Sequence, residues 1–318
     1  MKNFEYARAR SINGAIQLST PESRFLAGGI DLLGEMKEYI ISPKRVIDLK
    51  SIPDLDRIDT SLSSWKLGAN VTITEIAKNP QIIAKLPGLA EAALEVGSPQ
   101  IRNTATIGGN LAQHSRCWYY RHRDLRCLKR GGSTCYARDG ENKYHSLFSG
   151  NPCISPIASN LAVILAALNA RVNIRRGDEE FALTIPELYS DAWNNPLAHN
   201  SLLPGDLIVH VEIPMQMNRS TYLQVSEKGD FDWALVSCAA AGRNAGDRWA
   251  DVSVFLGAVA PIPYRVKSPL FDSGELSSEA IESIAESVAL KATPLVHNAY
   301  KVPIAQALVR RALTRIVS

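Results

Sequence analysis

The chain has 318 residues, of which 46% are apolar and 21% charged, and its net charge is only +3. This length allows two or three packed units with cores of their own, and the weak charge argues against a nucleic-acid or membrane-surface partner. No run approaches the roughly 20 apolar residues that span a membrane. The N-terminal stretch lacks the apolar core of a secretory signal, so we expect no signal peptide.

The first 55 residues predict a small parallel α/β unit. Phe25 to Ala27 lead into a glycine turn, residues 32–37 follow a helical pattern, and residues 45–49 are again strand-like. A strand, a helix and a second strand in such close succession favour parallel pairing of the strands. We therefore place an α/β subdomain at residues 1–55.

Residues 56–200 predict a second unit with a long insertion. The pattern indicates strands at residues 65–69 and 170–175 and helices at residues 74–79, 88–96 and 161–169. Residues 115–155 are polar and show little periodicity. A compact domain rarely contains about 40 such residues unless something orders them.

Residues 201–318 predict a third unit of α+β type, because strands come first and amphipathic helices follow. The expected strands cover residues 207–214, 233–241 and 252–259, and the expected helices cover residues 278–290 and 302–317. The first strand ends at Pro214, which cannot donate to a sheet ladder.

Two segments with paired glycines follow apolar runs: residues 26–32 read LAGGIDL, and residues 104–110 read TATIGGN. Because glycine has no Cβ, its backbone amide can approach an anion closely and help to form a phosphate nest. Thr106 and Asn110 add side-chain donors. Neither segment is a G-x-G-x-x-G fingerprint, so a Rossmann site is disfavoured, and each alone is more typical of a tight turn. As a pair they favour a diphosphate held between two domains.

Four of the five cysteines, Cys117, Cys127, Cys135 and Cys153, lie in the insertion with the spacing C-x9-C-x7-C-x17-C. Four thiolates are what a [4Fe–4S] cluster needs, and the basic residues around the first two would stabilise its negative charge. The spacing lacks the C-x-x-C knuckles common in structural zinc sites. Zinc, disulfides and a nucleic-acid patch remain alternatives. Cys238 lies in an apolar run and is expected to be a buried small hydrophobe.

The order of several motifs resembles the FAD-binding (medium) subunits of the xanthine dehydrogenase and aldehyde oxidase family of molybdenum hydroxylases. These motifs are the two glycine segments, SPIASNL at residues 155–161 and IVHVEIP at residues 208–214. The resemblance covers essentially the whole chain and implies an α+β fold. A two-part FAD-binding domain of the vanillyl-alcohol-oxidase (PCMH) type would precede a C-terminal α+β domain with an antiparallel sheet and helices.

The resemblance also implies which residues bind FAD. They are Leu26, Ala27, Gly28, Gly29, Ile30, Asp31, Leu32, Thr106, Gly108, Gly109, Asn110, Asn160, Ile208 and Lys228. Asn160 stands where the family usually has an aspartate on the flavin's sugar hydroxyls, and an amide can still hydrogen-bond a hydroxyl. Ile208 and Lys228 would lie near the flavin ring.

Most xanthine dehydrogenase relatives lack the cysteine insertion. Its start, GGNLAQHSRCWYY at residues 108–120, is similar to the FAD-binding subunits of 4-hydroxybenzoyl-CoA reductase and, above all, of the bacterial periplasmic aldehyde oxidoreductases. These subunits carry an extra [4Fe–4S] cluster in the insertion. By that resemblance Cys117, Cys127, Cys135 and Cys153 are the cluster ligands.

The resemblance implies an electron-transfer subunit of a molybdenum-dependent aldehyde oxidoreductase. A large partner would carry the molybdenum cofactor, a small partner would carry two [2Fe–2S] clusters, and FAD held here would pass electrons to an external acceptor. The alternatives are an FAD subunit like that of hydroxybenzoyl-CoA reductase or xanthine dehydrogenase, a self-contained flavin oxidase, and a zinc-stabilised assembly module.

Two sequence observations point to different cellular locations. A lone chain without a signal would stay in the cytoplasm, whereas the strongest resemblance is to a periplasmic enzyme. Folded cofactor proteins can be exported as a complex when one subunit carries a twin-arginine signal. We therefore expect the periplasm, reached by co-export with a signal-bearing partner, with the cytoplasm as the alternative.

Overall fold

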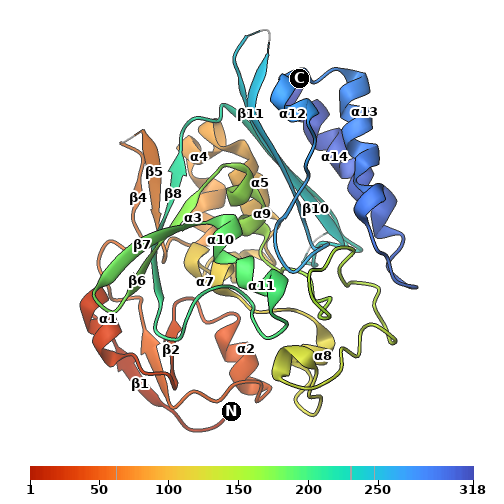
Figure 1. Cartoon of the computed structure of the whole chain (residues 1–318). Helices are drawn as coiled ribbons and strands as arrows, with labels where there is room; N and C mark the ends of the chain where they lie inside the picture. The colour runs from red at the N-terminus through yellow and green to blue at the C-terminus, as the bar shows by residue number, and fades with distance from the viewer. Residues whose placement is uncertain (62, 230, 247) are drawn as a thin grey trace.

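Three sheets follow one another along the chain (Figure 1). The computed structural model describes residues 1–61, 63–229, 231–246 and 248–318. The first sheet is parallel, and the other two are antiparallel. The α+β class and the antiparallel C-terminal sheet expected from the sequence are therefore confirmed. Within the described residues, no helix has the length and apolar character needed to cross a membrane.

The first sheet has the order β1-β3-β2. Its strands are β1 (Glu5–Arg8), β2 (Ser23–Leu26) and β3 (Arg45–Asp48), and its helices are α1 (Ile12–Leu18) and α2 (Leu32–Lys37). The expected strand–helix–strand succession is confirmed, and both strand pairs are parallel. The sequence pattern did not predict β1 and α1, because they are short and contribute few apolar residues to a core.

The second sheet has the order β4-β5-β8-β6-β7. Its strands are β4 (Ile58–Asp59), β5 (Ser64–Gly68), β6 (Arg171–Arg176), β7 (Glu179–Thr184) and β8 (Leu207–Pro214). The helices around it are α3 (Ile73–Lys78), α4 (Pro80–Lys85), α5 (Pro87–Leu94), α6 (Pro99–Arg102), α7 (Ile107–Ala112), α9 (Asn160–Ala167), α10 (Ile185–Leu188) and α11 (Ser190–Asn194). Strand β8 pairs with β5 and β6, so it belongs to this sheet although it follows residue 201.

The third sheet has the order β12-β11-β10-β9 and is covered by the C-terminal helices. Its elements are β9 (Arg219–Val225), β10 (Val236–Asn244), β11 (Trp249–Gly257), β12 (Tyr264–Arg265), α12 (Leu270–Ser273), α13 (Ser278–Ser287), the short helix η2 (Ala289–Lys291) and α14 (Lys301–Val317). Strand β10 is buried on both faces: Cys238 belongs to the core under α13 and α14, whereas Ala239 belongs to the core around α9. Cys238 is fully buried, as expected.

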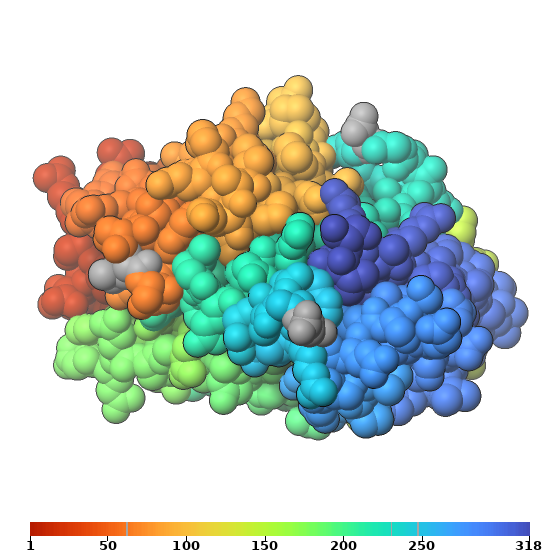
Figure 2. All heavy atoms as spheres, turned by 90° about the horizontal axis from the view of Figure 1, so that it is seen from above, coloured from red at the N-terminus to blue at the C-terminus, as the bar shows by residue number. Residues whose placement is uncertain are grey.

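The second and third units pack directly against each other. Seen from above (Figure 2), the orange atoms of the second unit border the dark-blue atoms near the C-terminus, and helix α5 contacts β9 and β10. Glycine at position 88 permits this approach, since a Cβ there would lie 2.8 Å from the Thr221 nitrogen. At the rim, Arg315 pairs with Glu91 at 2.6 Å.

The insertion contains little regular structure, only α8 (Trp118–Arg121) and the short helix η1 (Leu128–Arg130). In Figure 1 it lies beside α2 and below the third unit. Its end is tied to that unit, because Leu147 and Phe148 both donate to the Val259 carbonyl and belong to the core under α13 and α14.

Candidate functional site

The two glycine loops meet face to face. Gly28 and Gly29 follow β2, and Gly108 and Gly109 lie in the first turn of α7. A Cβ on Gly28 would lie only 2.1 Å from the carbonyl oxygen of Thr104, so the loops could not approach this closely with any other residue there. Gly29 has φ +73°, the left-handed region that favours glycine. Both glycines are thus required by the backbone before any ligand is considered.

The contact between the two glycine loops leaves three backbone N–H groups without an acceptor among the described residues. The N–H groups of Gly28, Gly29 and Ile30 take part in none of the hydrogen bonds among the described residues. Opposite them, Thr106 caps α7, where its hydroxyl oxygen accepts from the Gly109 N–H at 3.1 Å. Successive free amides of this kind form a nest for an anion, so the loops can hold a phosphate group.

A cavity of about 660 Å³ runs between these loops. All of the predicted FAD-binding residues line it except Leu26, which does not border it, and Lys228, which lines a neighbouring cavity. The wall also includes residues that were not predicted to bind FAD, among them Asn70, Leu202, Phe231 and Trp233. The structure shows that Phe231 and Trp233 are exposed at this wall, and the sequence signal available for them was two aromatic residues beside Asp232.

Buried polar atoms in this cavity lack partners, which is what a polar ligand would correct. The Asn70 amide nitrogen donates to the Leu49 carbonyl at 2.9 Å, but its Oδ1 atom has no partner among the described residues. The Arg116 Nε atom is equally unpartnered. Since an unpaired buried polar atom costs about 1–3 kcal/mol, these atoms fit a large ligand rich in donors and acceptors, as FAD is.

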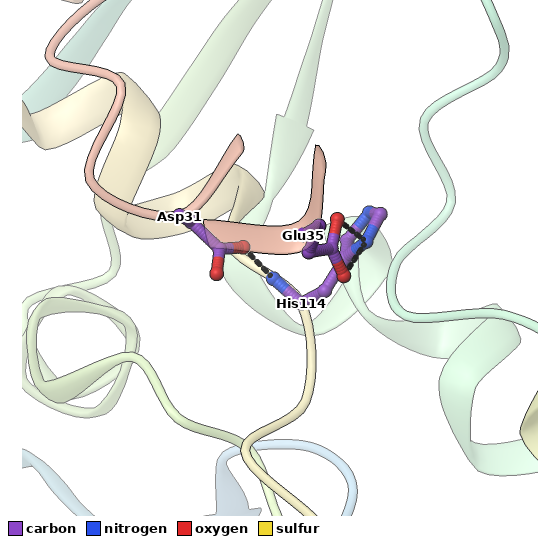
Figure 3. A group of neighbouring side chains, drawn as sticks. All are labelled: Asp31, Glu35 and His114. Atoms are coloured by element: carbon purple, nitrogen blue, oxygen red, sulfur yellow. Dashed lines mark hydrogen bonds and ion pairs between the residues drawn. The ribbon is translucent and has the colours of Figure 1, made fainter. Parts of the chain in front are cut away.

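Asp31 and Glu35 form an ionic cluster with the start of the insertion (Figure 3). Asp31 accepts from the His114 N–H at 2.7 Å and also pairs with Arg116 and Arg121. Burial raises the pKa of Asp31, but the charges of the two arginines outweigh it, and the net pKa is lowered. The three carboxylate and imidazole groups lie within 4.8 Å of one another, yet the arginines already neutralise the carboxylates. The cluster is therefore an anchor rather than a cation site.

Glu35 extends this anchor into the protein. Its carboxylate is buried, contacts His114 Nδ1 at 3.0 Å and accepts from the Tyr120 hydroxyl at 2.7 Å. Burial raises the pKa of Glu35. The His114 hydrogen bond and the charges of His114 and Arg121 lower it by more, so the net pKa is lowered. His114, which lines the large cavity, also stacks on His199 at 4.0 Å. The insertion is thus fixed to α2.

The four cysteines of the insertion gather around Lys129. This buried lysine donates to the Ala198 carbonyl at 2.7 Å. Burial lowers its pKa, while the negative charges that all four thiols can carry act to raise it. All five cysteines of the chain are free thiols in the structure. Residues separated by up to 36 positions in sequence therefore share one site.

Several contacts suit sulfur atoms that carry negative charge. Burial raises the pKa of Cys117 to about 11, although the N–H groups of Tyr119 and Tyr120 point at its sulfur and act in the opposite direction. The Cys153 thiol hydrogen-bonds Cys135 and lowers the pKa of Cys135 to about 6, while the pKa of Cys153 itself is raised. His145 Nε2 lies 3.2 Å from the Cys117 sulfur.

Two of the four sulfur atoms are in direct contact, because the Cys135 and Cys153 side chains hydrogen-bond each other. The Cys117 thiol also senses the charges of Cys127 and Cys135. Four neighbouring thiols are a ligand set that either a zinc ion or an iron–sulfur cluster can use.

Several basic residues of the insertion hold its backbone in place through ion pairs and hydrogen bonds. Arg116 and Arg121 bind Asp31, and Arg130 donates to the carbonyl groups of His122, Arg123 and Leu125. Lys129 is the buried cation next to the thiols, and the expectation that the basic residues offset a negative cluster stays a prediction.

A second cavity of about 300 Å³ adjoins the first. The two cavities share the residues Arg116, Ala158, Asn160, Asp232 and Trp233. The second one continues to Cys117, Trp118, Tyr144 and His145 of the insertion and to Lys228. It therefore lies between the large cavity and the cysteine site.

Comparisons with known proteins agree with this geometry. Two family models match in succession, "FAD binding domain in molybdopterin dehydrogenase" over residues 2–216 and "CO dehydrogenase flavoprotein C-terminal domain" over residues 220–316. The aldehyde oxidoreductase FAD-binding subunit PaoB of Escherichia coli K12 is 31% identical over 313 residues, with 96% of each chain covered. The carbon monoxide dehydrogenase medium chain of Hydrogenophaga pseudoflava is 27% identical, covering 98% of this chain and 96% of that one.

A solved structure shares the fold. Carbon monoxide dehydrogenase from Hydrogenophaga pseudoflava matches with a TM-score of 0.77 at 22% identity, covering 99% of this chain and 98% of that chain. The expected arrangement, an FAD-binding domain followed by a flavoprotein C-terminal domain, is confirmed by this likeness and by the two family models. The exact unit boundaries at residues 55 and 200 stay predictions.

Proposed function

The chain belongs to the molybdenum hydroxylase family as one of its FAD-binding medium subunits, and from this premise we propose that it carries electrons within an aldehyde oxidoreductase. The relative at 31% identity is an FAD-binding subunit of that kind of enzyme. The cavity of about 660 Å³ between the two glycine loops carries the proposal, because it combines free amides with unpartnered polar side chains.

This chain's residues would bind and orient the cofactor. The amides of Gly28, Gly29 and Ile30 would hold the FAD pyrophosphate, and Asn160 would hydrogen-bond the sugar hydroxyls, while Ile208 would pack near the flavin ring. FAD supplies the redox chemistry, taking electrons one or two at a time. Lys228 lines the adjoining cavity, which shares Asn160 and Trp233 with the FAD cavity, so it would lie beside the end of the flavin ring.

A [4Fe–4S] cluster held by Cys117, Cys127, Cys135 and Cys153 is the second part of the proposal. Four thiols around one buried lysine and backbone amides directed at the Cys117 sulfur support it. A cluster would also help to order a long segment that contains only two short helices, because metal ligation supplies folding energy where a core is missing.

The remaining parts concern the assembly. We expect a large subunit with the molybdenum cofactor and a small subunit with [2Fe–2S] clusters, electrons passing from the latter to FAD and then to an external acceptor. The relatives that are named medium chains support a subunit of a larger enzyme. Co-export to the periplasm with a signal-bearing partner is the expected localisation, and the cytoplasm is the alternative.

The test is to purify the complex and to count FAD and iron per chain in the wild type and in two cysteine variants. Cys135→Ser should lose about four irons per complex, while the iron of the small subunit's [2Fe–2S] clusters stays. It should also lower the melting temperature, because a ligand is removed. Cys238→Ala should keep the iron, since Cys238 is buried in β10 away from the insertion. Unchanged iron in Cys135→Ser would refute the cluster, and a complex without flavin would refute the whole function.

A further inference from the structure

The second cavity has the features of a binding site for a small aromatic molecule. It lies between the FAD cavity and the cysteine site and measures about 300 Å³, at the lower end of the range for small-molecule sites. We propose that it binds the external electron acceptor, and that this acceptor is a small planar quinone. The proposal rests on the proposed electron-transfer function and names the acceptor's chemical class.

Aromatic side chains that are partly open to solvent make the walls of this cavity. Trp118 is 39% exposed, Tyr144 36% and Trp233 53%. Trp118 and Tyr144 meet edge to face, with ring centroids 5.4 Å apart and planes at 81°. Large exposed aromatic groups gathered at one hollow mark an interaction site, and flat aromatic walls select a flat ligand.

The polar groups suit electron-rich oxygen atoms. Arg116 lines the cavity and places a cationic guanidinium in its wall. Lys228 adds a second cation on the opposite segment. The carboxylates on that segment are already occupied, since Glu227 binds Lys143 and Tyr144, and Asp232 accepts from the N–H groups of Lys228 and Trp233. The two carbonyl oxygens of a quinone match donors without adding a buried charge.

Other acceptors fit less well. A nicotinamide dinucleotide is close to FAD in size and needs a phosphate nest, but this cavity has less than half the volume of the FAD cavity, and no glycine borders it among the described residues. Dioxygen needs no aromatic pocket. A one- or two-ring quinone fills the space and uses the walls.

The position of the cavity allows electron transfer from the proposed FAD site. Arg116, Asn160 and Trp233 border both cavities, so a ligand in the second cavity would lie next to the end of the first. The quinone would take two electrons and two protons, and its carbonyl groups would become hydroxyls. Reduced FAD would give up the same electrons and protons and return to its oxidised state.

The experiment uses the assembled complex and menadione, a two-ring quinone. The enzyme is reduced by an aldehyde without oxygen, and the rate of flavin reoxidation is then measured against menadione concentration. Trp118→Ala and Tyr144→Ala should each raise the half-saturating concentration about tenfold, because each loses an aromatic wall. Reoxidation by ferricyanide, which needs no aromatic site, should keep its wild-type rate in both.

Tyr136→Ala is the matched control. Tyr136 follows the ligand candidate Cys135 as Trp118 follows Cys117, it is also 39% exposed, and it does not line the cavity. It should keep the wild-type half-saturating concentration. The proposal is overturned if all three variants respond alike, if wild-type rates never saturate, or if Trp118→Ala changes the flavin spectrum, which would make the cavity part of the FAD site. A wild-type flavin that the aldehyde does not reduce would instead refute the proposed function.

Discussion

At the scale of single residues, Gly28 sets how closely the two halves of the FAD site approach. A Cβ at this position would lie 2.1 Å from the Thr104 oxygen, which belongs to backbone and cannot move aside like a side chain. From the sequence these glycines are explained by close access to a phosphate. The structure shows that Gly28 is also required by the contact between the two loops.

Gly28→Ala should therefore separate the loops. We expect a loss of about 1 to 3 kcal/mol in unfolding free energy, the usual cost of overpacking, and FAD binding at least tenfold weaker. Urea unfolding and fluorescence titration with FAD measure the two effects. Gly34→Ala in α2 is the control: a Cβ there meets nothing within 4 Å, so it should stabilise slightly through helix propensity. Equal behaviour of the two variants would contradict the packing argument.

The buried carboxylate of Glu35 makes a pH-dependent prediction. Its folded pKa is lowered, so its contribution to stability is present above the unfolded pKa of about 4.3 and is lost as pH falls through the lower folded value. Glu35→Gln should cost about 3 kcal/mol at pH 7, and the difference from wild type should shrink below pH 4.

Urea unfolding across this pH range is the measurement, with Glu22→Gln as the control. Glu22 pairs with Lys44 on the surface, where both side chains are mostly exposed, so its loss should change stability by less than 1 kcal/mol. A Glu35→Gln variant as stable as Glu22→Gln at pH 7 would show that the anchor around α2 is dispensable.

At the scale of elements, most strands and helices of the core follow the sequence pattern, but their starts depend on local hydrogen bonds. The third-sheet strand expected from Trp233 begins at Val236. Asp232 explains the difference, because its carboxylate accepts from the N–H groups of Lys228 and Trp233 and so holds this segment as a loop. A side chain that bonds nearby backbone competes with a strand ladder, and apolar periodicity does not report it.

Helix α14 begins with a buried lysine that no periodicity would predict. Lys301 is fully buried and donates to the carbonyl groups of His145 and Ala258. Asn298 donates to the His145 carbonyl as well. The start of α14 therefore fixes the backbone of His145, and the imidazole of His145 contacts the Cys117 sulfur.

Burial lowers the pKa of Lys301 to about 7. Between pH 7 and the unfolded value near 10.4, the unfolded chain binds the extra proton, so this group makes the folded protein gain stability as pH rises. Lys301→Met should remove that gain, on the order of a few kcal/mol. Urea unfolding of the wild type and of Lys301→Met at pH 7 and pH 9.5 is the measurement. An equal change in unfolding free energy between the two pH values in both proteins would contradict the prediction.

At the scale of the whole molecule, the cysteine site and the FAD site share one set of side chains. Arg116 follows Ser115, precedes Cys117 and binds Asp31 in the first glycine loop, and its guanidinium lies 4.8 Å from the Trp233 ring. A change that releases Cys117 would therefore move a group that holds the FAD loop. Binding at the two sites should be coupled, and such coupling is reciprocal.

Removing the iron should weaken FAD binding. We expect Cys117→Ser to raise the FAD dissociation constant at least fivefold, within the usual range of coupling between sites. Conversely, FAD-depleted wild type should lose iron to a chelator faster than the FAD-loaded protein. Cys238→Ala serves as the control and should show neither effect. An unchanged dissociation constant in an iron-free Cys117→Ser protein would mean that the two sites are independent.

The sequence by itself determined the elements and motifs whose signals are local. The parallel first unit, the glycine turns, the cysteine spacing and the C-terminal helices each depend on residues close together in the chain, where backbone preference and apolar periodicity act. Its motif order also indicated the family. Only the tertiary structure brought Asp31 to Arg116, Lys301 to His145 and Trp118 towards Trp233 at one cavity. These contacts join residues about 85 to 160 positions apart, and packing of whole units decides such meetings because no local pattern encodes them.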